Sequence, residues 1–147
     1  MQLTHFTDIG LRLLMYVAQA PEGQLVTLAE VATQFGMSQN HLVKVVNRLV
    51  KVGWVEAVRG RNGGVRLMVP PERLHLGKVV RELEGSESLL DCHKLECVLE
   101  GSCQLQGVLR QATTQLYNWL DQYTLADVIK RPTGPLLRRM YKAWPSR

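Results

Sequence analysis

The segment from Thr27 to Val69 constrains the fold more than any other part of the chain, because it predicts two short helices, a glycine turn and a hairpin. Thr27 opens a Thr-Leu-Ala-Glu sequence, which is typical of a capping box at a helix start. Gly36 favours the left-handed conformation that ends a helix, and Ser38 stands where a second N-cap belongs. Two capped helices joined by so short a turn predict a helix-turn-helix.

The second helix of this pair is amphipathic, and a basic hairpin follows it. Strand-like runs at 54–58 and 65–69 flank an Arg-Gly-Arg-Asn-Gly-Gly sequence, and Asn-Gly is a strong hairpin signal. We therefore expect a mainly α fold, namely a winged helix-turn-helix with a two-stranded β wing. Apolar residues at helical spacing predict the core face of the second helix: Leu42, Val45, Val46, Leu49 and Val50.

Further helices are predicted on both sides of this unit, at residues 6–20, 76–83 and 104–123. Thr7 or Asp8 is expected to cap the first, and a Thr-Leu-Ala-Asp sequence at 124–127 to cap one more short helix. No apolar run approaches the length of a membrane span, and the start of the chain lacks the features of a secretion signal. We therefore expect a cytoplasmic protein with no membrane partner.

Positive charge is concentrated in two segments, the helix-turn-helix with its hairpin and the end of the chain. Residues 38–66 contain six Lys or Arg and one Glu, giving +5, and residues 130–147 carry +6 with no acid. The whole chain carries +5, so the remainder is acidic. A basic middle on an acidic body is the electrostatic footprint of a protein that binds a polyanion. A purely structural three-helix module is the alternative, but it has no need of this charge.

The residues expected to contact DNA lie at the start of the second helix and on the hairpin. The first residues of a recognition helix reach base edges in the major groove, where amide side chains can bond adenine. Basic residues further along suit phosphates, and a narrow cationic wing tip suits the minor groove. The predicted DNA-binding residues are Thr27, Ser38, Gln39, Asn40, His41, Lys44, Arg48, Arg59, Arg61 and Asn62.

The long helix predicted over residues 104–123 carries one apolar stripe. Such a stripe can pack on its own domain, but a dimer arm accounts for it better, because dimers read two half-sites. We therefore predict a long C-terminal dimerisation helix. The stripe consists of Leu105, Val108, Leu109, Ala112, Leu116, Trp119, Leu120 and Tyr123.

Three cysteines, Cys92, Cys97 and Cys103, lie close together in the chain. Their odd number argues against a disulfide framework, and their spacing lacks the paired C-x-x-C of zinc ribbons. Three thiolates can hold a metal or an iron–sulfur centre if a fourth ligand is supplied. Candidates within the loop are Asp91, His93 and Glu96. From spacing alone, free thiols, zinc and an iron–sulfur cluster remain equally open.

Five motifs run in order along the chain and, with the cysteines, resemble a known family. The motifs are Phe6-Thr7-Asp8-x-Gly10-Leu11-Arg12, Asn40-His41-Leu42-Val43-Lys44, Val58-Arg59-Gly60-x-Asn62-Gly63-Gly64, Val79-Val80-Arg81-Glu82-Leu83-Glu84 and Tyr123-Thr124-Leu125-Ala126-Asp127. Over about residues 1–130 the chain resembles the IscR/NsrR family of iron–sulfur winged-helix regulators, in particular its nitric-oxide-sensing, NsrR-like branch. IscR-like relatives use a His shortly after the third cysteine, and residues 104–107 contain none.

The resemblance implies a homodimer that binds a palindromic site in double-stranded promoter DNA while its cluster is intact. Nitric oxide attacks the cluster, the affinity for DNA falls, and nitric oxide detoxification genes are derepressed. Cys92, Cys97 and Cys103 match the cysteine ligands, and Asp8 matches a fourth ligand given by each subunit to its partner. A [4Fe–4S] cluster is favoured over a [2Fe–2S] cluster, and His93 is the alternative fourth ligand.

The sequence therefore predicts a transcriptional repressor and not an enzyme, because it has no Gly-rich cofactor loop and no nucleophile–base set. One alternative is a regulator that senses cluster or iron supply. Another is a small iron–sulfur electron carrier, but a basic wing would have no purpose in such a protein. We expect a DNA-binding domain over 1–71, a short helix and cluster-binding loop over 72–103, a dimerisation helix and short capped helix over 104–130, and a poorly ordered basic tail over 131–147.

Overall fold

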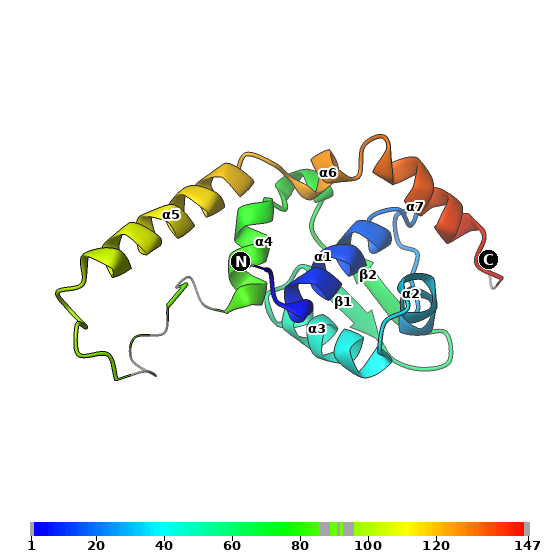
Figure 1. Ribbon diagram of the computed structural model, residues 1–147. Coiled ribbons are helices and arrows are strands. Elements are labelled where there is room, and N and C mark those ends of the chain that lie inside the picture. The colour runs from blue at the N-terminus through cyan, green and yellow to red at the C-terminus, as the bar shows by residue number, and fades with distance from the viewer. Residues whose placement is uncertain (1, 86–88, 91, 93–95, 146–147) are drawn as a thin grey trace.

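The computed structural model describes residues 2–85, 89, 90, 92 and 96–145. Figure 1 shows α1 at the centre of the body, α3 along its lower edge, and α5 projecting away from it with the cysteine-bearing segment at its far end. This helical arrangement with a two-stranded antiparallel wing confirms the predicted winged helix-turn-helix. The elements in chain order are α1 (His5–Val17), α2 (Leu28–Phe35), α3 (Gln39–Lys51), β1 (Val55–Val58), β2 (Gly64–Leu67), the 3₁₀ turn η1 (Pro71–Arg73), α4 (Leu76–Glu84), α5 (Gln104–Leu120), α6 (Leu125–Val128) and α7 (Thr133–Lys142).

The helix-turn-helix forms where the sequence predicts it. The Thr27 hydroxyl accepts the N–H of Glu30 at 3.1 Å, and Gly36, with φ of 63°, ends α2. The buried Glu30 carboxylate accepts a hydrogen bond from the Tyr16 hydroxyl at 2.7 Å, which ties α2 to α1. Ser38 occupies the N-cap position of α3, but its side chain makes no capping hydrogen bond. Ser38 is therefore the N-cap residue, as predicted, but the capping hydrogen bond expected from its side chain is not formed.

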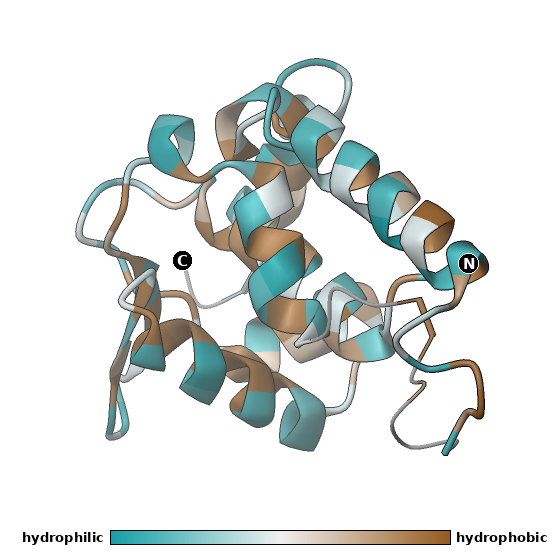
Figure 2. Ribbon diagram, turned by 90° about the vertical axis from the view of Figure 1, so that its left-hand side faces the viewer, coloured by the Kyte–Doolittle hydropathy of each residue, from teal (hydrophilic) through white to brown (hydrophobic). Residues whose placement is uncertain are grey.

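The core face of α3 is narrower than its apolar pattern suggests. Leu42, Val45, Val46 and Leu49 are buried, whereas Val50 is 41% exposed. At 100° per residue, Val50 lies at the edge of the stripe, so its prediction as a core residue was wrong. Figure 2 shows apolar and polar segments alternating along the helices, as amphipathic helices around a shared core require.

The hairpin is confirmed, with a longer loop than an Asn-Gly turn would make. The Gly63 N–H donates to the Gly60 carbonyl at 3.0 Å, so Arg61 and Asn62 are the two central residues of the turn. Gly60, and not the Asn-Gly pair, takes the positive φ, at 106°. The turn therefore places Arg61 and Asn62 at the tip of the wing.

The second strand of the wing is hydrogen-bonded to the segment that precedes α2. Val26 and Val65 exchange two backbone hydrogen bonds of 2.9 and 2.8 Å. The strands approach closely here, because a Cβ added to Gly64 would lie 2.6 Å from the Val26 carbonyl oxygen. The wing is thus held at a fixed position relative to the helix-turn-helix.

The first helix starts and ends differently from its prediction. It spans His5–Val17, and Thr4 is its N-cap, with the Thr4 hydroxyl accepting the Thr7 N–H at 3.2 Å. The predicted caps, Thr7 and Asp8, were therefore wrong. Three residues that can cap a helix, Thr4, Thr7 and Asp8, stand within five positions of one another, and residue preference alone does not rank them.

Helix α5 packs against the side of α4. α4 ends before Gly85, as predicted, and the buried residues of α5 are Thr113 and Tyr117. The Arg81 guanidinium lies over the Tyr117 ring at 5.0 Å and forms an ion pair with Asp121. α5 ends at Leu120, three residues before its predicted end.

Gly77 allows α4 and α5 to approach closely, because a Cβ there would lie 2.5 Å from the Tyr117 carbonyl oxygen. We expect Gly77→Ala to lower the free energy of unfolding by about 1–3 kcal/mol, as overpacking does. Urea denaturation followed by circular dichroism measures this. Gly107→Ala is the matched control, since nothing lies within 4 Å of its added Cβ, and removing a helical glycine should stabilise by about 0.5–1 kcal/mol. Equal effects of the two substitutions would contradict the close contact.

Residues 124–130 connect α5 to the last helix. Thr124 and Asp127 form the predicted capping box of α6. Hydrogen bonds from Lys130 and Thr124 hold the pKa of the Asp127 carboxyl well below its ordinary value. This carboxylate therefore favours the capped structure at neutral pH, and its contribution is lost only in strong acid.

The prediction of a poorly ordered tail was wrong for residues 133–142, which form α7. α7 packs on the core through Leu137 and Tyr141, which are 4% and 7% exposed. Pro132 and Pro135 do not prevent the helix, because they lie at its N-cap and in its first turn, where no N–H is needed. Within the described residues, every helix is too short or too polar to span a bilayer.

Candidate functional site

The start of α3 presents polar side chains to solvent. Gln39, Asn40 and His41 are exposed together with Ser38, and the first turn contains no acidic residue. The Ser38 hydroxyl is not used to cap the helix. A helix N-terminus also directs free N–H groups and a positive dipole outward. This surface can therefore bond to base edges and to phosphates.

The first residue of α1 extends this surface. The His5 ring meets the His41 ring edge-on, with centroids 5.7 Å apart. Sequence reasoning missed His5, because no local signal relates it to a helix 36 residues away. Thr27, also predicted to contact DNA, is half-buried, and its hydroxyl caps α2.

The basic residues of α3 divide into two kinds. Lys44 is exposed on the outer face. Arg48, predicted to contact DNA, extends to α4, where its Nη2 lies 2.5 Å from the Glu82 Oε1. Arg48 therefore links the candidate recognition helix to the helix that precedes the cysteine loop.

The wing places its cations at the tip and pairs one at the base. Arg59, Arg61 and Asn62 are exposed. Lower down, the Arg66 Nη2 lies 2.7 Å from the Glu56 Oε2 on the paired strand. The exposed tip, rather than the whole hairpin, is the part suited to a narrow groove of negative potential.

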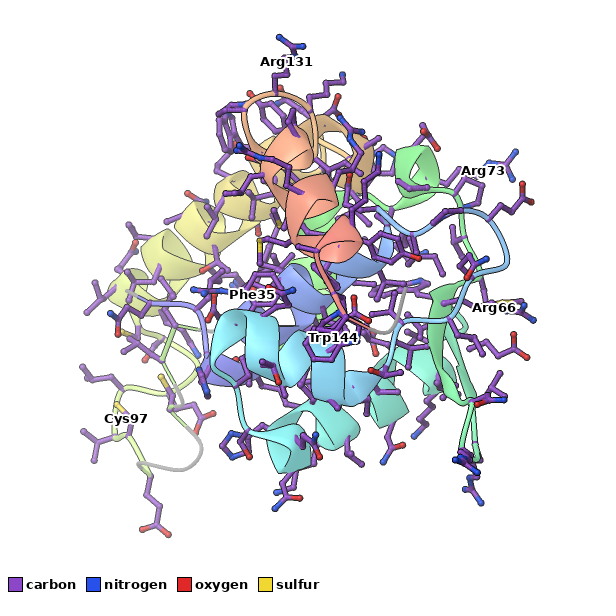
Figure 3. All side chains as sticks on the ribbon, turned by 90° about the vertical axis from the view of Figure 1, so that its right-hand side faces the viewer. Phe35, Arg66, Arg73, Cys97, Arg131 and Trp144 are labelled. Atoms are coloured by element: carbon purple, nitrogen blue, oxygen red, sulfur yellow. The ribbon has the colours of Figure 1, made fainter. Side chains whose placement is uncertain are left out.

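The cysteine loop lies away from the wing. Cys92 is buried, Cys97 and Cys103 are half-buried, and all three are thiols rather than disulfides. The Cys97 N–H donates to the Cys92 carbonyl at 3.1 Å, and Cys103 is the N-cap residue of α5. Figure 3 shows Cys97 on the opposite side of the view from Arg66 of the wing.

The donor types in this loop fit an iron–sulfur cluster, although the structure does not gather them. Thiolates are the ligands such clusters prefer, and Cys103 lies at the N-terminal end of α5. Among the described residues, no three Cys, His, Asp or Glu side chains converge into a metal-binding group. The loop candidates Asp91 and His93 lie outside the described residues.

Asp8 stands on the surface of α1 and does not cap it. Its Oδ1 accepts a hydrogen bond from the Arg12 Nε at 2.8 Å, and its side chain is 41% exposed. An exposed pair of this kind contributes only about 0.3–0.5 kcal/mol. The carboxylate is therefore held loosely and is accessible to another molecule.

The apolar stripe of α5 faces solvent and not α4. Leu105, Val108 and Trp119 are 59%, 60% and 55% exposed. The Trp119 ring lies 4.9 Å from that of Tyr123, which is also exposed. The remaining members of the stripe are exposed Ala112 and half-buried Leu109, Leu116 and Leu120. A single chain thus leaves this contiguous apolar face largely uncovered.

Comparison with known proteins agrees with this arrangement. Residues 3–131 match the model of the Rrf2 family, described as iron-dependent transcriptional regulators. The chain is similar to IscR of T. potens, with 25% identity and a TM-score of 0.69 over 88% of this chain and 86% of that one. It is similar to the oxidised form of CymR from Staphylococcus aureus, with 26% identity and a TM-score of 0.68 over 88% and 97% of the two chains. CymR of B. subtilis, the global cysteine regulator, shares the fold at 24% identity, with a TM-score of 0.70 over 87% and 95%.

Proposed function

Because the chain belongs to the Rrf2 family of iron-dependent transcriptional regulators, we propose that it is a dimeric repressor whose hold on promoter DNA depends on an iron–sulfur cluster and is released by nitric oxide. Membership of this family confirms that the chain is a regulator and not an enzyme, and it removes the electron-carrier alternative. The proposal therefore concerns the DNA contacts, the cofactor, the signal and the dimer.

The start of α3 carries the DNA-binding part of the proposal. Gln39, Asn40 and His41 enter the major groove and contact base edges. Lys44 and the wing residues Arg59 and Arg61 neutralise phosphates, so binding falls steeply as salt is raised. A palindromic site follows if two copies read it, because a two-fold dimer presents two identical α3 helices.

Cys92, Cys97 and Cys103 are the thiolates that would hold the cluster in each subunit, with [4Fe–4S] favoured over [2Fe–2S]. When bound, the cluster supplies iron that can react with nitric oxide. Asp8 of the partner subunit is the fourth ligand in this proposal. A hard carboxylate binds cluster iron less firmly than a thiolate does, so one iron would carry a ligand that nitric oxide can replace. The single observation that carries this assignment is that Thr4, and not Asp8, caps α1, leaving the Asp8 carboxylate exposed.

The proposal is tested on protein purified without oxygen. Visible absorption, iron and sulfide are measured, and the protein is then titrated with nitric oxide while DNA binding is followed. We expect a brown protein with matched iron and sulfide that loses colour and DNA affinity together. A colourless protein that binds DNA equally well with and without nitric oxide would overturn the cluster and the signal, but would leave the winged helix intact.

The role of Asp8 has its own matched variants. Asp8→Ala should alter the cluster spectrum and the nitric oxide response. Arg12→Ala removes the same ion pair but keeps the carboxylate, so it should leave both unchanged. Identical spectra of Asp8→Ala and the unchanged protein would sink the ligand assignment and favour His93.

A regulator of cluster or iron supply is the second candidate, favoured by the similarity to IscR of T. potens. Such a protein would carry the same loop but would respond to the presence of the cluster and not to nitric oxide. Loss of DNA binding on iron removal, without loss on nitric oxide addition, would select this candidate.

A further inference from the structure

The last helix, α7, presents a row of cations that lies beyond the matched family segment. The family model ends at residue 131, and α7 spans Thr133–Lys142. Arg138, Arg139 and Lys142 are exposed, and residues 130–147 contain no acid. At 100° per residue these three side chains span about 100° of the helix surface, and Arg139 points away from the buried Leu137 and Tyr141.

This helix is attached directly to the helix-turn-helix. The Gln34 side chain of α2 donates to the Met140 carbonyl at 3.1 Å. The Tyr141 ring lies 6.3 Å from the ring of Tyr16, and Tyr16 lies 5.6 Å from Phe35 of α2. Figure 1 shows the C-terminal end of α7 approaching α2, and Figure 3 shows Trp144 in front of the same helix. The cations of α7 are therefore held in a fixed position relative to the helix-turn-helix.

The first helix of a helix-turn-helix crosses the DNA backbone. α7 ends against that helix, with Arg139 and Lys142 in its last turn. In double-stranded DNA the phosphates continue on both sides of any half-site, and contacts to them add affinity without sequence information. A helix that carries cations and no acidic residue fits this continuous row of phosphates. It fits a second copy of this chain less well, because the negative charge of that copy lies only outside its basic segments.

We infer that α7 binds backbone phosphates of the DNA that flanks the operator half-site. This inference rests on the proposed operator binding and extends the contacted DNA beyond the operator half-site. The chain would then protect a longer stretch of DNA than its recognition helix and wing require, and part of its salt dependence would come from outside the specific site.

The test uses the cluster-bearing protein and a site recovered by selection from a pool of random duplexes. Two duplexes are compared, the core site alone and the core extended by about one helical turn, roughly 10 base pairs, at each end. We expect the unchanged protein to have a steeper salt dependence on the extended duplex. Arg139→Gln/Lys142→Gln should remove about four phosphate contacts per dimer. When salt is raised from 50 to 200 mM, the affinity of this variant for the extended duplex should therefore fall by a factor roughly 100 times smaller than that of the unchanged protein.

Two control variants make the result specific. Arg73→Gln/Lys78→Gln removes the same charge from exposed positions on η1 and α4 and should keep the steep dependence. Arg139→Lys/Lys142→Arg keeps the cations and should also keep it. Thermal unfolding of Arg139→Gln/Lys142→Gln should be unchanged, since both side chains are exposed.

An equal salt dependence of Arg139→Gln/Lys142→Gln and the unchanged protein on the extended duplex would overturn the inference. Equal loss in the Arg73→Gln/Lys78→Gln control would also overturn it, because general charge would then explain the effect. If the variant loses binding to vesicles of anionic lipid while its binding to DNA stays unchanged, α7 faces a membrane surface and not DNA. Failure of every variant to bind the core duplex is a separate result and would contradict the proposed operator binding itself.

Discussion

Replacing Trp119 with aspartate should convert the protein into a monomer and lower its affinity for a two-half-site operator by roughly 10²–10⁴-fold. Trp119 is 55% exposed at the end of an apolar stripe that α4 does not cover. In a dimer the indole would be buried against the second copy, and a charge there would be left without a partner at high cost. Binding of two linked half-sites gains from the second contact being intramolecular, and a monomer loses that gain.

The measurement combines light scattering with binding to duplexes that carry one or two half-sites. We expect the variant to have the mass of one chain and to bind a single half-site as well as before. Asn118→Asp is the matched control, because Asn118 is the neighbouring exposed residue and points about 100° away from Trp119 around α5. A dimeric Trp119→Asp protein with normal operator affinity would mean that the stripe is not the dimer interface.

The same substitution bears on the cluster. If Asp8 of one subunit ligates the cluster of its partner, a monomer cannot complete the ligand set. We therefore expect Trp119→Asp to lose the native spectrum as well as operator affinity. A monomer that retains the native cluster spectrum would place the fourth ligand in the same chain.

Local signals predicted the helix-turn-helix, and long-range contacts escaped prediction. Thr27 and Gly36 act within a few residues of themselves, so capping rules suffice for them. The pairing of Arg48 with Glu82 spans 34 residues, and only the fold brings the two together. Arg48 was therefore placed correctly on the polar face of α3, while its partner on α4 could not be read from the pattern.

The tail illustrates the opposite error, in which local signals were given too much weight. Two prolines and a glycine predicted disorder, yet Leu137 and Tyr141 find apolar surface on the core and the segment folds. Helix stability in proteins comes mostly from such packing and not from propensity. Proline in the first turn of a helix is also compatible with it, so the prolines marked the start of α7 rather than its absence.

The cysteine loop marks the limit of sequence reasoning from the residues themselves. Spacing left free thiols, zinc and a cluster equally open, and only the family resemblance separated them. The fourth ligand cannot follow from one chain if it comes from another subunit. Residue preference makes Asp8 a candidate helix cap, and the observed Thr4 cap removes that competing role.

Asn40→Ala should lower affinity for the specific site by roughly 30-fold or more and leave binding to unrelated DNA unchanged. Asn40 is exposed in the first turn of α3, where residues reach base edges. One bidentate amide–adenine pair discriminates by about 1–3 kcal/mol, and a dimer makes two of them. Phosphate contacts by Lys44 and the wing remain, so the non-specific affinity and its salt dependence should persist.

Asn47→Ala is the control that isolates position from chemistry. Asn47 is exposed on the same face of α3, two turns further along, roughly 10 Å from Asn40 at 1.5 Å per residue. Both substitutions remove the same amide and gain the same helix propensity, so their difference reports only what each side chain meets on DNA. Binding is measured on the selected site and on variants changed one base pair at a time. Relaxed preference at one base pair in each half-site, for Asn40→Ala alone, identifies the contact. Equal and uniform losses for both variants would mean that α3 lies along the backbone and that the wing or another element reads the bases.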